Sequence, residues 1–317
     1  MNAPLYQNPW NFMGLQEEHS SPGRARAWVL PAPHEGTTSY GAGTRDGPTA
    51  ILAASRPIER FDSEFGNEPA LVYGIHTLSA LAPVRQSPDS MVEAVEAAVS
   101  ALLSGRPRPE VLGILGGEHS LSAGAVRAVR RIVPGGSLVA VQIDAHGDLR
   151  DEYEGSRHSH GCAARRILDE CPLFQIGIRS LCAEEDAFRR GRADLVTVFS
   201  EAAADPAGAF LDDLARFVRG KNVYLTVDLD GLDPSIMPSV GTPEPGGIGW
   251  ERLLDIARVI AREAARVPVF DVVELAPIPV LRAPDFLAAK LVYKLFSLVL
   301  LGRRGGQAVR PGAAARP

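Results

Sequence analysis

Short apolar runs without polar alternation constrain the fold of this chain most. Leu138, Val139, Ala140 and Val141 follow one another, although successive side chains of a strand point to opposite faces. A strand that is apolar on both faces is typical of a parallel sheet covered by helices on each side. Such runs alternate with helical patterns throughout, which is the sequence sign of an α/β layer structure. We therefore expect a three-layer α/β fold.

The same patterns place the individual elements. Strands are expected near Ala27–Pro31, Ala70–Ile75, Val111–Leu115, Ser137–Asp144, Leu173–Ile178, Leu195–Phe199, Asn222–Asp228 and Pro268–Leu275. Helices are expected near Pro48–Arg60, Ser90–Ser104, Ser120–Ile132, Pro206–Val218, Trp250–Arg266 and Pro284–Leu301. No linker is long enough to divide this series. We expect an N-terminal arm over residues 1–24, a single main domain over 25–302 and a flexible tail over 303–317.

Composition excludes several kinds of partner. The chain has 317 residues, a formal charge of −5 and no basic block before its extreme C-terminus, so we expect no nucleic-acid partner. The apolar run Leu291–Leu301 contains Lys294 and is too short to span a bilayer, so we expect no membrane partner. The N-terminus lacks the pattern of a signal peptide, and the three cysteines lack CxxC spacing. These features predict a cytoplasmic protein with reduced thiols.

Two acidic clusters predict a metal centre. Asp144, His146 and Asp148 stand at i, i+2 and i+4 directly after the apolar run of residues 137–143, so a continuing strand would point all three to one side. Asp228 and Asp230 repeat the i, i+2 spacing after another apolar run. A site with more carboxylates than imidazoles and no thiolate suits a hard divalent ion such as Mn²⁺ better than Zn²⁺.

His119 and Glu274 also follow apolar strand candidates. Ligands of open parallel sheets bind beyond the carboxyl ends of the strands, so four segments are expected to deliver acids or imidazoles to one edge. Two ions that share bridging carboxylates need such a large donor set, and paired ions support metal-assisted hydrolysis. Each segment alone has an ordinary alternative: Ser120 could cap a helix, and the run from Asp228 to Pro234 could be a turn.

Several motifs together resemble the ureohydrolases, the family of arginases and agmatinases. They are GGEHS (116–120), DAHGD (144–148), SHG (159–161), VDLDGLDP (227–234) and DVVELAP (271–277), and the resemblance extends over roughly residues 28–300. It implies a parallel eight-stranded sheet, two Mn²⁺ ions per chain and a homo-oligomer, trimer or hexamer. One ion would take His119, Asp144, Asp148 and Asp228. The other would take Asp144, His146, Asp228 and Asp230.

The resemblance also implies three catalytic roles. Asp148 would ligate metal and accept a hydrogen bond from the attacking water, and Glu274 would pair with a planar guanidinium. His160 would pass a proton to the departing amine, because imidazole can do so near neutral pH. Each has an alternative: His160 could be a solvated loop histidine, and Glu274 could form a structural salt bridge.

The most similar subgroup is the agmatinases of archaeal and bacterial type, so we expect agmatine to be cleaved to putrescine and urea. Acidic residues of the loop after Asp148 (Asp151, Glu152 and Glu154) are expected to border the pocket and attract an ammonium group, whereas Arg150 and Arg157 could receive a carboxylate. A guanidinobutyrase, a guanidinopropionase or an arginase therefore stays open, as does a catalytically silent metal-binding partner subunit. Glu118 stands where the family more often has Asp, behind the first metal ligand.

Overall fold

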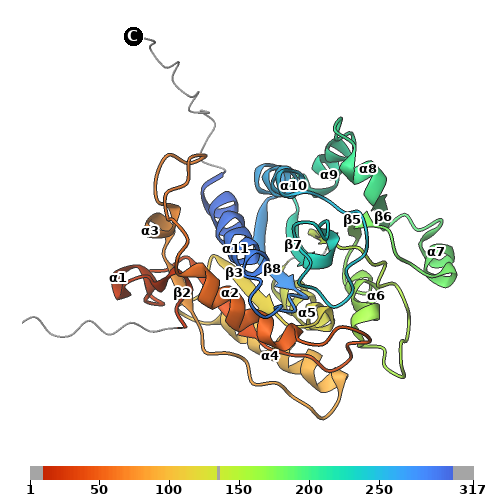
Figure 1. The fold of residues 1–317 in the computed structure, drawn as a ribbon, viewed down its shortest axis with the longest axis horizontal. Helices are drawn as coiled ribbons and strands as arrows, with labels where there is room; N and C mark the ends of the chain where they lie inside the picture. The colour runs from red at the N-terminus through yellow and green to blue at the C-terminus, as the bar shows by residue number, and fades with distance from the viewer. Residues whose placement is uncertain (1–9, 134–135, 303–317) are drawn as a thin grey trace, which may run out of the picture.

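A single parallel sheet forms the middle layer of the molecule (Figure 1). The computed structural model describes residues 10–133 and 136–302. All strand pairs of the sheet are parallel, in the order β2-β1-β3-β8-β7-β4-β5-β6. The strands are β1 (Ala27–Ala32), β2 (Ile75–Thr77), β3 (Val111–Gly116), β4 (Leu138–Ile143), β5 (Leu173–Ile178), β6 (Leu195–Phe199), β7 (Asn222–Asp228) and β8 (Arg266–Val273).

Helices cover both faces of this sheet, which explains why the central strands carry apolar side chains on either side. One core includes side chains of α2 (Gly47–Ser55), α9 (Phe210–Val218), α10 (Trp250–Glu263) and α11 (Ala283–Leu301). The other core includes side chains of α4 (Pro88–Ser104), α5 (Ser122–Ile132) and α6 (Ala163–Leu168). The predicted three-layer α/β fold with an eight-stranded parallel sheet is confirmed.

The expected strand over Ala70–Ile75 is wrong. Pro69–Tyr73 forms a short helix, α3, and the strand β2 begins only at Ile75. Proline fits the first turn of a helix, and Gly74 ends this one with a φ of 66°, a value that glycine adopts without strain. The apolar run was too short for its period to separate helix from strand. Four further short helices were not expected: α1 (Glu17–Ser20), α6, α7 (Ala183–Arg189) and α8 (Ser200–Ala204).

The chain before β1 packs against the domain where it is described. Phe12, the first residue of the short 3-10 helix Phe12–Gly14, is fully buried in the first core. The first nine residues of the expected arm and the expected tail over 303–317 lie outside the described residues. Among the described helices, none combines the length and the apolarity that crossing a bilayer would require.

Candidate metal centre and active site

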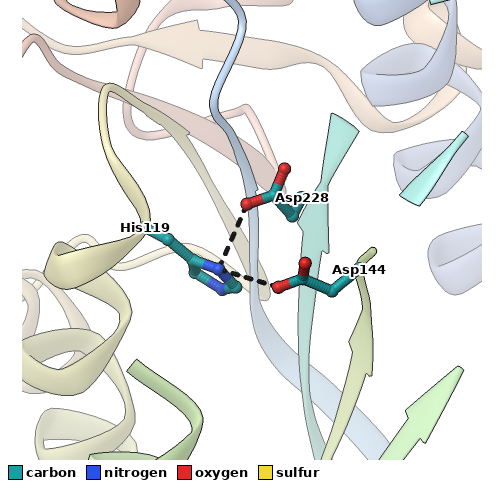
Figure 2. A group of neighbouring side chains, drawn as sticks. All are labelled: His119, Asp144 and Asp228. Atoms are coloured by element: carbon teal, nitrogen blue, oxygen red, sulfur yellow. Dashed lines mark ion pairs between the residues drawn. The ribbon is translucent and has the colours of Figure 1, made fainter. Parts of the chain in front are cut away.

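Four neighbouring strands in the middle of the sheet deliver the predicted site residues. In spatial order β3, β8, β7 and β4, their carboxyl ends lead to His119, Glu274, Asp228 and Asp144. These residues are far apart in the sequence, and Figure 2 shows three of them pointing toward one another across the strand ends. The predicted convergence at one edge of the sheet is therefore present.

The first group of ligands is gathered around His119. Its Nδ1 lies 3.1 Å from an oxygen of Asp144 and 3.2 Å from an oxygen of Asp228, the two contacts drawn in Figure 2. A carboxylate oxygen of Asp148 also lies 3.2 Å from Nδ1. All four side chains are buried. One nitrogen and three carboxylate oxygens thus surround a single small space.

A second group shares Asp144 with the first. His146 Nδ1 lies 2.9 Å from an oxygen of Asp230 and 3.7 Å from Oδ1 of Asp144. The donor atoms of these three residues lie within 4.8 Å of one another, as do those of His119, Asp144 and Asp228. A carboxylate that belongs to both groups can bridge two ions, which is the arrangement of binuclear hydrolases.

The backbone turns sharply where two of the carboxylates leave their strands. β4 ends at Ile143, so the three ligands of the DAHGD segment do not continue it as a regular strand. Asp148 instead has a φ of 50°, and Glu274 after β8 has a φ of 65°. Such values cost free energy in residues other than glycine and cluster at functional sites.

The carboxylates and imidazoles shift one another's pKa. Burial and the neighbouring carboxylates raise the pKa of Asp228 well above its usual range, and burial with the charge of Asp144 raises that of Asp148. Burial alone would lower the pKa of His146, but Asp144 and Asp230 raise it to about 12. Without bound cations the site therefore keeps protons that metal ions would have to displace.

The fit to a metal ion can be judged at one atom. His119 Nδ1 is buried and has no hydrogen-bond partner among the described residues, although three carboxylates approach it. Its other ring nitrogen, Nε2, lies 2.9 Å from Thr226 Oγ1. A hydroxyl that accepts from Nε2–H would leave the lone pair of Nδ1 directed at the carboxylates, as a ligating histidine requires. The residues present fit a cation of high charge.

A cavity of about 310 Å³ opens over these groups. Its lining includes His119, His146, Asp148, Asp228, Asp230, Glu274 and His160. Glu274 accepts a hydrogen bond of 2.6 Å from the backbone N–H of His119, and burial raises its pKa well above the usual range. Both predicted catalytic side chains outside the ligand set therefore border the same space as the ligands.

The loop after Asp148 differs from the expectation. Arg150 and Tyr153 line the cavity, with the guanidinium carbon of Arg150 4.9 Å from the centre of the Tyr153 ring. The acidic residues of this loop, all of them described, are absent from the lining. Asp151 instead accepts hydrogen bonds from Arg157 at 3.0 Å and from Arg166 at 2.7 Å. A buried arginine needed a partner, and this requirement was not visible in the loop sequence.

Sequence reasoning missed the residues that support the ligands. Thr226 contacts His119, and Gln142 Nε2 donates a hydrogen bond of 2.6 Å to Asp144. Both are fully buried in strands. A polar residue within an otherwise apolar strand was the available signal, because a buried polar group requires a partner.

Comparison with known proteins agrees with this geometry. The model of the Arginase family matches residues 25–297. An N(1)-aminopropylagmatine ureohydrolase of Synechocystis is 39% identical over 84% of this chain and 87% of its own. An agmatinase of Halalkalibacterium halodurans is 33% identical over 80% of this chain and 85% of its own. The structure of an agmatine ureohydrolase of Thermoplasma volcanium, 28% identical, superposes with a TM-score of 0.79 over 92% of this chain and 94% of that one. The resemblance seen in the motifs is thus confirmed, and the chain belongs to the arginase family.

Proposed function

We propose that this protein is a binuclear manganese hydrolase that cleaves a guanidino compound into urea and an amine. One observation carries the proposal: two histidine–aspartate groups share Asp144, and their other members line a cavity whose wall also includes a buried glutamate. The names of the similar proteins, ureohydrolase and agmatinase, support the same reaction class. A catalytically silent partner subunit would not need the glutamate and the loop histidine at the cavity wall.

The distances support the proposed ligand sets, except for Asp228 in the second set, which the family resemblance implies. His119, Asp144, Asp148 and Asp228 would hold one ion, because three carboxylate oxygens lie within 3.2 Å of His119 Nδ1. Asp144, His146, Asp228 and Asp230 would hold the other. Four carboxylates would balance the charge of two divalent ions, and oxygen-rich sites favour Mn²⁺. When bound, the pair of ions would make water a stronger acid at neutral pH and polarise the substrate.

Three side chains would position the substrate and transfer protons. Glu274 would accept two parallel hydrogen bonds from the guanidinium and so hold the central carbon in place for attack. Asp148 would accept a hydrogen bond from the attacking water. His160 would donate a proton to the departing nitrogen as the C–N bond breaks, so that the amine leaves neutral.

Agmatine and its aminopropyl derivative are the substrates that we propose. The curated proteins compared above support both: the one 39% identical is named for aminopropylagmatine and the one 33% identical for agmatine. Arg150 at the cavity wall leaves a carboxylate-tailed substrate as the competing candidate. Urea release from agmatine, N1-aminopropylagmatine, arginine, guanidinobutyrate and guanidinopropionate, measured with added Mn²⁺, separates them. Faster turnover of a carboxylate-tailed compound would reject the amine-tailed class.

Replacing one ligand tests the metal assignment. We expect Asp230→Ala to bind one manganese per chain in place of two and to lose nearly all urea release while keeping the wild-type circular dichroism spectrum. Metal content by mass spectrometry and urea release are the two measurements. Full activity in this variant would contradict the second ligand set. The homo-oligomer, a trimer or hexamer, stays a prediction that light scattering of the same samples can check.

A further inference from the structure

Glu118 is a buried carboxylate that precedes the first proposed metal ligand in the sequence, but its hydrogen bonds are made with other residues. Its oxygen Oε2 accepts from the backbone N–H groups of Gly36 at 2.6 Å and Thr37 at 2.7 Å. Its other oxygen, Oε1, accepts from Ser120 Oγ at 2.6 Å and from Thr37 Oγ1 at 2.8 Å. Glu118 is fully buried. Four donors around one carboxylate leave no room for a proton on it, so it acts only as an acceptor.

The hydroxyl of Thr37 stands between this carboxylate and His160. A hydroxyl has one hydrogen and two lone pairs, and the hydrogen of Thr37 is used on Glu118. Two nitrogens of His160 approach the same oxygen: the backbone N donates to it at 3.0 Å, and Nδ1 lies 3.2 Å away. The Thr37 hydroxyl can therefore only accept hydrogen bonds from these two nitrogens. Ser159 Oγ lies farther from the same ring nitrogen, at 3.4 Å, so the shorter contact with Thr37 favours a hydrogen on Nδ1.

The remaining ring nitrogen of His160 is Nε2. It lies 3.4 Å from Ser39 Oγ, and Ser39 and His160 both line the cavity. The Tyr153 ring lies edge-on to the imidazole with ring centres 5.7 Å apart, so the ring is held from a second side. With Nδ1 already protonated, Nε2 is the atom at which a proton is gained and lost.

We propose that Glu118, acting through the Thr37 hydroxyl, is a positioning residue that fixes His160 in the Nδ1–H tautomer and makes Nε2 its working acid–base atom. This inference rests on the proposed function of His160. It assigns a role to a residue that does not touch the substrate. It also gives Glu118 a role that does not require contact with the neighbouring His119 ring.

Neutron diffraction of manganese-loaded, deuterium-exchanged crystals tests the inference without reference to turnover. At about pD 9 an ordinary imidazole is neutral, so a single deuterium marks the tautomer. We expect deuterium on Nδ1 of His160 and on Thr37 Oγ1 directed at Glu118, with Nε2 bare. Deuterium on Nε2, alone or together with Nδ1, would overturn the proposal even if the wild-type enzyme released urea normally.

Glu118→Gln keeps the size of the side chain but reverses one hydrogen bond. The amide can offer its NH₂ to Thr37, which frees the threonine hydrogen to point at His160 Nδ1. We expect the deuterium to move to Nε2 and kcat to fall about 10- to 100-fold, with KM within about threefold of wild type. Manganese content must stay at the wild-type value, because Glu118 adjoins a proposed ligand. Deuterium that remains on Nδ1 in this variant would show that Glu118 does not set the tautomer.

A pair of substitutions at Thr37 keeps the test decisive if Glu118→Gln does not fold. Thr37→Ser retains the hydroxyl, so we expect the wild-type tautomer and a kcat within about threefold of wild type. Thr37→Val keeps the shape without the hydroxyl, and we expect kcat to fall as in Glu118→Gln. Equal kcat values in the two variants would contradict the relay. If instead the wild-type protein hydrolysed no guanidino compound, the proposed function would fail while the neutron result still decided the tautomer.

Discussion

Thr226→Val tests whether the support of a ligand, and not only the ligand itself, determines metal binding. The substitution keeps a β-branched side chain of nearly the same shape in β7, so the strand should be preserved. It removes the hydroxyl that lies 2.9 Å from Nε2 of His119. Both side chains are almost completely buried, so water cannot replace the lost partner.

The size of the effect follows from that burial. A buried N–H without a partner costs about 1–3 kcal/mol. In the metal-free variant the imidazole can turn toward another acceptor, whereas a ring fixed by a metal ion cannot. The cost therefore falls mainly on the bound state, and at about 1.4 kcal/mol per factor of ten it weakens manganese binding about 5- to 150-fold.

Calorimetric titration of metal-stripped protein with Mn²⁺ measures this change, and urea unfolding of the metal-free forms checks the fold. Ser122→Ala is the matched control, because Ser122 donates a hydrogen bond of 3.0 Å to Asp271 in the same buried network. We expect the control to lose stability but to bind manganese within about threefold of wild type. Wild-type affinity in a folded Thr226→Val protein would refute the reasoning.

Three further predictions concern the same site. The pKa of His146 is raised to about 12, so the folded metal-free protein keeps a proton that the unfolded chain loses above about pH 6.5. The stability of the metal-free protein should therefore fall as the pH rises from about 7 to 9. Calorimetry in the presence of a chelator measures this, and a constant melting temperature would contradict it. Gly117→Ala would place a Cβ 1.8 Å from the carbonyl oxygen of His34 and should lower the free energy of unfolding in urea by about 3 kcal/mol or more. Gly23→Ala is the control: its Cβ would have no atom within 4 Å, so the free energy of unfolding should change by less than about 0.5 kcal/mol. Glu274→Gln should keep both metal ions but lower kcat/KM about 10- to 150-fold, because it removes a charged hydrogen bond worth about 1.5–3 kcal/mol; unchanged urea kinetics would reject its role with the guanidinium.

The fold was predictable where the apolar pattern was long and unambiguous. The run from Leu138 to Val141 predicted a strand buried on both faces, and the sheet order confirms a parallel layer covered on each side. The run from Ala70 to Ile75 misled because a proline and a glycine, and not the apolar residues, decide its conformation. Short helices such as α7 bury little and carry too few residues for a period to be read.

The candidate site was predictable for the residues whose chemistry is explicit in the sequence. Asp144 directly follows β4 and Asp228 is the last residue of β7, and their meeting needed only the rule that parallel strands end at one edge. The polar position of Thr226 in an apolar strand was visible, but neither its contact nor that of Thr37 could be assigned, because a hydroxyl contact depends on which strands and turns become neighbours in space. The pairing of Asp151 with Arg166 illustrates the same point: sequence shows the charge, but the folded chain selects the partner.

The position of β8 has a consequence for metal binding during synthesis on the ribosome. This strand, the last among the described residues, lies between β3 and β7, so it joins a three-stranded half of the sheet to a four-stranded half. The four-stranded half already contains β4 and β7, whose ends carry Asp144, His146, Asp228 and Asp230, whereas His119 follows β3 in the other half. Nascent chains arrested before β8 should therefore bind at most one manganese ion, and two ions only after the segment around Glu274 has emerged, which makes uptake of the second ion a reporter of completed synthesis.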